Sequence, residues 1–253
     1  MTPVLAGAEV SPVVAFTVND RPGYLAETLE SWSRVRGIEK AHLIFRAEPG
    51  HPGVLAVCRD VSFAAEVTVT INPRRLGPGG NPWRAIEAGF ATGTGYVILA
   101  EDDTPVSDDI LEYLDWARRE YAADPSVLVA CAFQHHRRPG GPAGALLLPC
   151  FYSQVFGVWR DRWETELRDD WDFDYRYRGY DWNLRDRFMQ ARDFRAVFPC
   201  ESRSQVSGEH GGTHLHPGAE YQAHLSDCFA PHYDPVAFGE ITLDDPGPCG
   251  YCP

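Results

Sequence analysis

Short apolar runs rich in β-branched residues recur along the first half of the chain, and segments with helical spacing separate them. Strands are predicted at residues 13–18, 41–45, 67–71, 96–100 and 127–132. Helices are predicted from Pro22 to about Trp32, at residues 83–90, and from Asp108 or Asp109 to about Tyr121. This alternation predicts an α/β fold with a mostly parallel sheet that helices cover on both faces.

Length and composition narrow the class of protein. The chain has 253 residues, of which 44% are hydrophobic, enough for one large α/β domain with a substantial core. The net charge of 23 − 36 = −13 argues against a general nucleic-acid surface, so phosphate binding would need a metal ion and a few local cations. We expect no membrane span and no signal peptide, because the sequence shows neither pattern.

The cysteines indicate a reducing compartment. Seven are present, an odd number, and four lie singly in apolar runs as small buried residues would: Cys58, Cys131, Cys150 and Cys200. Cys249 and Cys252 form a CxxC in the last five residues without a second pair, so we interpret them as part of a tail.

Three acids, Glu101-Asp102-Asp103, follow the apolar run at residues 96–100. Carboxylates are hard oxygen donors that suit Mg²⁺ or Mn²⁺, and such an ion could hold a diphosphate. The alternative is a solvated turn whose acidity Asp108 and Asp109 continue.

The position of these acids favours a binding site. Ligands of parallel sheets bind beyond the carboxyl ends of the strands. Three polar loops are expected to meet there, at residues 19–21, 46–51 and 101–103.

The second half of the chain is aromatic and charged. Its clustered rings suit the flat faces of sugars or ordinary core packing: Trp159, Trp163, Trp171, Tyr175, Tyr177, Tyr180 and Trp182. Residues 207–218 are rich in glycine and histidine and could close over a ligand.

The order of several motifs resembles a known family. The strand ending in Glu-Asp-Asp is followed by a helix, Ala-Asp-Pro-Ser at residues 123–126, an apolar strand, Phe-Gly-Val-Trp at residues 156–159, and Tyr-Asp-Trp at residues 180–182. This order resembles the inverting N-acetylglucosaminyltransferase I family and its protein O-mannose relatives, which are GT-A glycosyltransferases. The similarity runs from about Val13 to Leu225.

The resemblance implies roles for the acids. Asp103 matches the family's ligand of Mn²⁺ (or Mg²⁺), Asp102 would face the sugar or ribose, and Glu101 would support the loop. Asp181 matches the catalytic base and opens a helix predicted to reach Arg192. Rival bases, or a solvated acidic loop, lie at Asp169, Asp170, Asp172 and Asp174.

The nucleotide contacts carry over in part. Arg21, with Asn19 beside it, matches an arginine in the turn after the first strand. Glu48 aligns with the acid that reads the uracil imide, which favours UDP. Asn81 stands where the family has a histidine that contacts uridine, a departure that leaves the nucleotide open.

The family's glycine-rich loop, which contacts the diphosphate, also has a match in this sequence. It matches residues 208–214, so Thr213 or His214 would touch the diphosphate. The spacing of His210, His214 and His216 fits neither a zinc finger nor a HExxH helix.

The resemblance thus implies one GT-A domain, with a nucleotide-sugar-binding half (about residues 12–132), an acceptor and catalytic half (about 133–230) and a tail (231–253). It implies metal-dependent, inverting transfer of a hexose or N-acetylhexosamine to the hydroxyl of a small molecule, peptide or glycan. We expect a bacterial cytoplasmic enzyme. The alternatives are a sugar-nucleotide nucleotidyltransferase, which would carry a glycine-rich phosphate loop after the first strand, and a non-catalytic sugar-binding protein of the same fold.

Overall fold

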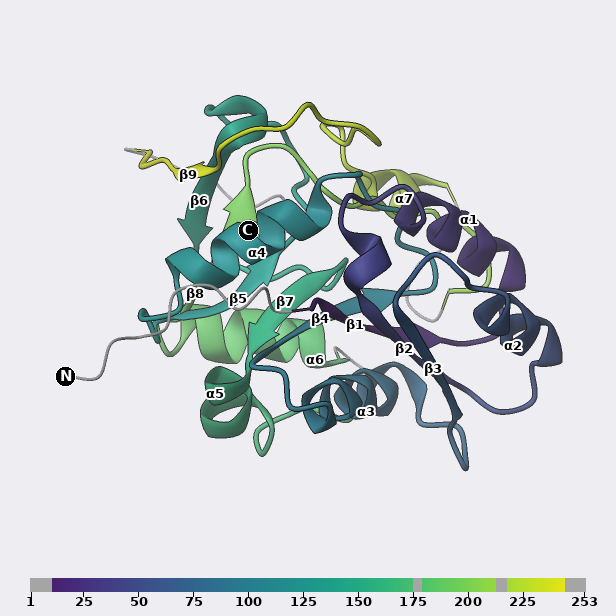
Figure 1. The fold of residues 1–253 in the computed structure, drawn as a ribbon. Coiled ribbons are helices and arrows are strands. Elements are labelled where there is room, and N and C mark those ends of the chain that lie inside the picture. The colour runs from purple at the N-terminus through teal and green to yellow at the C-terminus, as the bar shows by residue number, and fades with distance from the viewer. Residues whose placement is uncertain (1–10, 175–178, 213–217, 244–253) are drawn as a thin grey trace.

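The computed structural model describes residues 11–174, 179–212 and 218–243. These residues form a nine-stranded sheet in the order β3-β2-β1-β4-β7-β5-β8-β6-β9, with helices packed on both of its faces (Figure 1). The predicted α/β class with a mostly parallel sheet and helices on both faces is confirmed.

The N-terminal half of the sheet is parallel throughout. Its strands are β1 (Val13–Val18), β2 (His42–Ala47), β3 (Glu66–Ile71) and β4 (Tyr96–Glu101). β1 lies between β2 and β4, and β2 pairs with β3. Because all four strands run in the same direction, their carboxyl ends meet at one edge of the sheet. Each predicted strand appears within about two residues of its expected bounds.

The C-terminal half of the sheet is mixed. β7 (Phe156–Trp159) lies antiparallel between β4 and β5 (Val127–Cys131), with Phe156 opposite Leu99. The residues that precede β7 therefore lie at the edge where β4 ends. The remaining strands are β8 (Arg195–Pro199), β6 (Gly144–Leu148) and β9 (Gly239–Glu240).

Two hydrophobic clusters attach the helices to the sheet. Val14 and Phe16 of β1 face the cluster formed with α1 (Pro22–Trp32), α2 (Pro52–Arg59) and α4 (Ile110–Glu120). Ala15 faces the opposite cluster, formed with α3 (Gly77–Ala91), η3 (Trp163–Leu167) and η4 (Leu184–Gln190). Burial on both faces explains why the strands are continuous apolar runs. The shorter helices are η1 (Ile38–Lys40), η2 (Gly141–Ala143), α5 (Arg160–Arg162), α6 (Gly179–Asn183) and α7 (Ala219–His224).

Two helices depart from the sequence prediction. α3 begins at Gly77, ahead of the helix predicted at residues 83–90, and α2 was not predicted. Proline is tolerated in the first turn of a helix, where its missing N–H has no intrahelical partner. The first turn of α3 is further stabilised by a distant acid, because the Glu48 carboxylate accepts hydrogen bonds from the backbone N–H groups of Leu76 and Gly77. A contact between residues so far apart in sequence leaves no local signal.

Most aromatic side chains of the second half pack in the core. Trp159, Trp163, Trp171 and Tyr180 are each at most 6% exposed, so ordinary packing accounts for them. Tyr175 and Tyr177 lie outside the described residues.

The cysteine prediction is wrong at one position. Cys58, Cys131 and Cys200 are free and buried, as expected, but Cys150 is disulfide-bonded. The tail pair, Cys249 and Cys252, lies outside the described residues.

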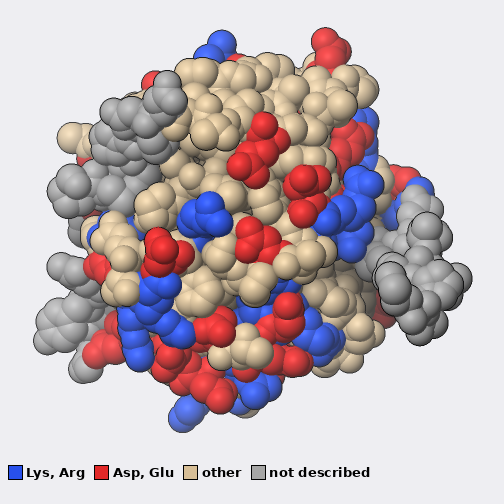
Figure 2. Space-filling view, turned by 90° about the vertical axis from the view of Figure 1, so that its left-hand side faces the viewer, with Lys and Arg blue, Asp and Glu red and all other residues tan. Residues whose placement is uncertain are grey.

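None of the helices in the described ranges has the length and apolar character needed to cross a bilayer. On the face of the molecule in Figure 2, basic side chains lie among acidic ones.

A buried ion pair joins the start of α4 to the segment after β8. Arg203 is 0% exposed, and its Nε donates to Asp109 Oδ2 at 2.9 Å. The Arg203 guanidinium also donates to the Glu201 carbonyl oxygen and lies 3.9 Å from the centre of the Tyr233 ring. The other Asp109 oxygen accepts from the Ser107 hydroxyl at 2.7 Å. The pair is therefore surrounded by compensating contacts on both sides.

Replacing Asp109 by alanine is expected to lower the free energy of unfolding by about 3–5 kcal/mol, because it leaves a buried guanidinium without its counter-ion. Urea unfolding followed by circular dichroism measures the change. The matched control is Asp115→Ala, which removes surface pairs with Arg118 and Arg119 and should cost less than about 1 kcal/mol. Equal losses in the two variants would contradict this account of the pair.

Candidate active site

A cleft of about 230 Å³ opens at the carboxyl ends of β1, β2 and β4. It brings together all the predicted site residues that the structure describes: Asn19, Arg21, Glu48, Asn81, Glu101, Asp102, Asp103 and Asp181. The expected convergence of the three loops is therefore observed. Thr213, His214 and His216 lie outside the described residues.

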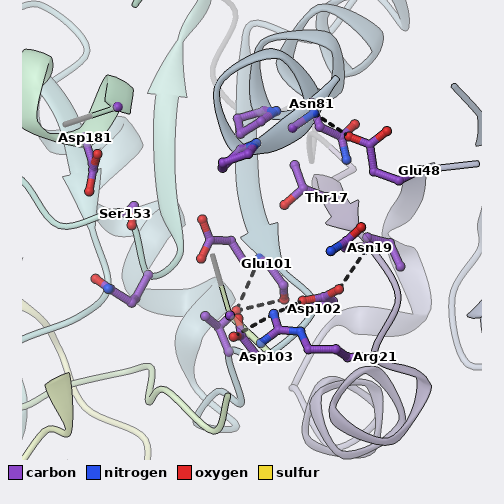
Figure 3. Close-up of a pocket in the computed structure, with 18 of the residues that line it drawn as sticks. Thr17, Asn19, Arg21, Glu48, Asn81, Glu101, Asp102, Asp103, Ser153 and Asp181 are labelled. Atoms are coloured by element: carbon purple, nitrogen blue, oxygen red, sulfur yellow. Dashed lines mark hydrogen bonds and ion pairs between the residues drawn. The ribbon is translucent and has the colours of Figure 1, made fainter. Parts of the chain in front are cut away.

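The centre of the cleft is an ion-paired cluster. Arg21 Nη2 lies 2.6 Å from Asp102 Oδ1 and 2.8 Å from Asp103 Oδ2. The second Asp102 oxygen accepts from the backbone N–H of Asn19 at 2.8 Å. Thus both oxygens of Asp102 are held by the turn after β1 (Figure 3), and Asp102 positions that turn.

Crowding and burial disfavour the charged carboxylates. Burial, followed by the Asp103 charge, raises the pKa of Asp102 to about 6, against the opposing effect of Arg21. The pKa of Glu101 is raised well above its usual value by burial first and then by the charges of Asp103, Asp102 and Asp181. The cleft therefore concentrates more negative charge than Arg21 neutralises, which favours an added cation.

A glycine-rich segment packs onto this cluster. The Ser207 N–H donates to the Asp103 carbonyl oxygen at 2.9 Å, and the Ser207 hydroxyl donates to the same oxygen at 3.2 Å. A Cβ at Gly208 would lie 2.0 Å from Asp103 Oδ2 and 2.7 Å from Arg21 Nη1, so a residue without a side chain is needed there. This segment belongs to the loop at residues 207–218, and its described part lies directly against the acids.

At another end of the cleft, Glu48 and Asn81 lie together (Figure 3). The two Glu48 oxygens accept hydrogen bonds from the N–H groups of Leu76 and Gly77 and from Asn72 Nδ2. Asn81 accepts from Asn72 Nδ2 at 2.9 Å and donates to the Arg46 carbonyl oxygen. Glu48 is thus a helix cap, a role that sequence reasoning missed, and its contact with uracil stays a prediction.

Asp181 lies beside Ser153, in the part of the cleft opposite Glu48 (Figure 3). Glu101 lies between Asp181 and Glu48. Asp181 is the third residue of α6, and it is near enough to Glu101 to help raise the pKa of that carboxyl group. None of the four rival acids, all of them described, lines the cleft. Of these four, Asp170 pairs with Arg187 and Arg192, and Asp169 pairs with Arg168. Of the five candidate bases, Asp181 alone lines the cleft, and its role as the base stays a prediction.

Sequence reasoning missed the segment before β7. Ser153 and Gln154 line the cleft because β7 is antiparallel to β4, which brings this segment beside Glu101. The next residue, Val155, has φ of 60°, a left-handed conformation that is unfavourable for a β-branched side chain. Such strain is often found where a turn presents functional groups. The apolar pattern of a strand does not reveal its direction in the sheet, so the antiparallel placement of β7 could not be predicted from the sequence.

A smaller pocket of about 70 Å³ adjoins the cleft at Asp181. The other residues that line this pocket come from the second half of the chain: His135, Phe151, Tyr152, Ser153, Gln154, Trp182, Arg185 and His224. Burial lowers the pKa of His135 to about 4, so this imidazole is neutral near pH 7. The pocket is aromatic and has few charges beyond Asp181 and Arg185.

The donor chemistry at the centre of the cleft fits a divalent ion. Across the described ranges, no three of the histidine, cysteine, aspartate and glutamate side chains form a preformed metal-binding group. Mg²⁺, however, is commonly held by one or two carboxylates together with substrate phosphates and water. Asp103 and Asp102 supply that many ligands, and the Arg21 guanidinium already marks a position where both carboxylates meet a cation.

No family model and no curated protein sequence matches the chain. Among solved structures, it is similar to the mannosyltransferase PcManGT from Pyrobaculum calidifontis, determined in complex with GDP-Man and Mn²⁺. The identity is 16% and the TM-score 0.51, over 76% of this chain and 55% of that one. It is also similar to S. aureus TarS 1-349, at 9% identity and a TM-score of 0.55, over 78% of this chain and 60% of that one.

These matches show that the chain has a GT-A fold, as the sequence resemblance implied. The chain spans less than two thirds of the length of either structure. These matches show the fold alone, so membership of the narrower N-acetylglucosaminyltransferase I family stays a prediction.

Replacing Gly208 by alanine is expected to lower the free energy of unfolding by about 1–3 kcal/mol, because the new methyl group would overlap the ion-paired Asp103 and Arg21 side chains. Urea unfolding measures the effect. The control is Gly95→Ala, where a Cβ meets nothing within 4 Å, and a change below about 0.5 kcal/mol is expected. A Gly208→Ala chain as stable as this control would show that the loop does not rest on the cluster.

Proposed function

We propose that the chain is a metal-dependent, inverting glycosyltransferase that moves a sugar from a nucleoside diphosphate sugar to an acceptor hydroxyl. The observation that carries the proposal is a single cleft that joins the Arg21–Asp102–Asp103 cluster to Asp181. Such a cleft can bind an anionic donor at its centre and place a carboxylate beside the reacting sugar. The similarity to a mannosyltransferase in complex with GDP-Man and Mn²⁺ supports the same class of donor.

The charged residues of the cleft suggest how the nucleotide-sugar donor would bind. Asp103, with Asp102 beside it, would hold a Mn²⁺ or Mg²⁺ ion, which when bound neutralises the diphosphate leaving group. Arg21 is the nearest protein cation and can donate to phosphate oxygens. Asn81 and Glu48 border the end where the nucleoside would lie. UDP is the favoured nucleotide on the argument from Glu48, and comparing the binding of UDP and GDP tests this choice.

Asp181 is proposed as the base. It would accept the proton of the acceptor hydroxyl as that oxygen attacks the anomeric carbon from the face opposite the diphosphate. Asp181 and the Arg21 cluster line one cleft of about 230 Å³, with Glu101 between them (Figure 3), and the donor sugar would lie in the middle of this cleft. One displacement inverts the anomeric centre, so no nucleophilic side chain is required.

The acceptor would enter through the smaller pocket. Asp181, Ser153, Gln154 and His224 line both cavities, so a hydroxyl group held there reaches the base. The aromatic walls suit the face of a sugar ring or an aromatic group.

Replacing Asp103 by asparagine should weaken the Mn²⁺-dependent binding of UDP by at least about tenfold, because the metal loses its anionic ligand. Isothermal titration calorimetry with UDP, with Mn²⁺ or with EDTA, measures the change. Asp115→Asn, which alters a surface carboxylate, is the matched control and should bind as the wild type does. Unchanged binding in EDTA would remove the metal from the proposal.

Replacing Asp181 by asparagine should leave the binding of UDP with Mn²⁺ intact and lower turnover by about 10²–10⁴-fold, because an amide cannot accept the proton. Release of UDP from a UDP-sugar, with and without candidate acceptors, measures turnover. Asp170→Asn is the matched control, since Asp170 lies outside the cleft. A wild-type rate in the Asp181 variant would rule out its role as the base.

A further inference from the structure

One guanidinium nitrogen occupies the position that a metal ion would compete for. Arg21 Nη2 bridges the two carboxylates, 2.6 Å from Asp102 and 2.8 Å from Asp103. A guanidinium that bridges two acids in this way acts as a substitute for a bound cation. The ion pair is well shielded, with side-chain exposures of 16%, 5% and 13% for Arg21, Asp102 and Asp103.

The rest of the same guanidinium is unused. Arg21 Nε and Nη1 are both buried, and neither has a hydrogen-bond partner in the part of the chain that the structure describes. Buried donors without partners are costly, so their retention calls for a physical reason. Each of these two N–H groups can donate a hydrogen bond to an oxygen of a phosphate group.

We propose that Arg21 is an internal counter-ion, which holds Asp102 and Asp103 together in the metal-free chain, releases them when the divalent ion binds, and then donates to the diphosphate. This inference rests on the proposed function for the identity of the ion and the donor. It adds a competition between Arg21 and the metal, which that function does not require.

Electrostatics explains the exchange. The like charges of Asp102 and Asp103 repel each other in this shielded position, so the two carboxylates strongly favour a cation between them. A guanidinium and a divalent ion at the same oxygens would repel each other. A divalent ion bound with a doubly charged diphosphate adds no net charge, and the diphosphate gives the released Arg21 a new anionic partner.

The glycine-rich loop packs closely against Arg21. Gly208 lies against Arg21 Nη1, and a Cβ at Gly211 would lie 3.4 Å from Arg21 Cδ. Glycine at both positions lets the loop backbone cover Arg21 without a side chain that would obstruct its movement. Tyr24 also borders it, with its ring centre 5.4 Å from the guanidinium carbon.

Replacing Arg21 by methionine should have opposite effects on the two ligands. Without nucleotide, Mn²⁺ should bind about tenfold more tightly, because its competitor is gone. With saturating Mn²⁺, UDP should bind about tenfold more weakly, because the phosphate donors are lost. Electron paramagnetic resonance of free Mn²⁺ measures the first affinity, and calorimetry measures the second. A purely structural role for Arg21 would weaken both. Arg34→Met, which removes an exposed arginine from the turn after α1, should change neither affinity.

The possible failures are distinguishable. If the wild-type chain binds no Mn²⁺ even with UDP present, the proposed function fails and the counter-ion role fails with it. If the wild-type chain binds Mn²⁺ with UDP but Arg21→Met binds Mn²⁺ no more tightly than the wild type, the counter-ion role alone is overturned.

A measurement on the wild-type chain covers the case in which Arg21→Met does not fold. In protein labelled with ¹⁵N-arginine, the Nε signal missing from the charge-preserving variant Arg21→Lys identifies Arg21. Formation of the complex with Mg²⁺ and UDP should shift this signal. An unchanged Arg21 signal in a complex that calorimetry shows to be formed would overturn the proposal.

Discussion

The contact between Arg21 and the two carboxylates of Asp102 and Asp103 is the interaction on which the cleft depends. A parallel sheet places the ends of its central strands at one edge, and here that edge carries three consecutive acids. Without an internal cation, mutual repulsion would push these carboxylates apart. Arg21 makes the arrangement possible, and it also ties the turn after β1 to the end of β4.

The second half of the chain supplies the remaining residues of the cleft. β7 enters the sheet antiparallel to β4, so the strained turn before it presents Ser153 and Gln154 to the acids. α6 adds Asp181, and the segment after Ser207 packs onto Asp103. One cleft therefore combines an electrostatic centre from a parallel half-sheet with a carboxylate from a separate element. This combination is the physical basis for assigning the two kinds of acid to different roles.

The sequence predicted the parts of the fold that local patterns encode. β1 has the expected bounds, and the acids lie at the predicted edge, because buried strands of a parallel sheet are continuous apolar runs. The start of α3 was missed, since its stabilising contact with Glu48 is distant in sequence. For the same reason, Glu48 was assigned to the nucleotide and not to a helix. The Arg21 ion pairs could be placed near the acids, but their geometry depends on the packed turn.

The most direct test of the account is a crystal structure of the chain with Mn²⁺ and UDP, with anomalous scattering recorded at the manganese edge. The account predicts a manganese peak within coordination distance of the Asp103 carboxylate, UDP phosphates bound to the same ion, and Arg21 in contact with a phosphate oxygen. A manganese peak elsewhere, or UDP bound outside the cleft with the Arg21 pairs unchanged, would contradict it.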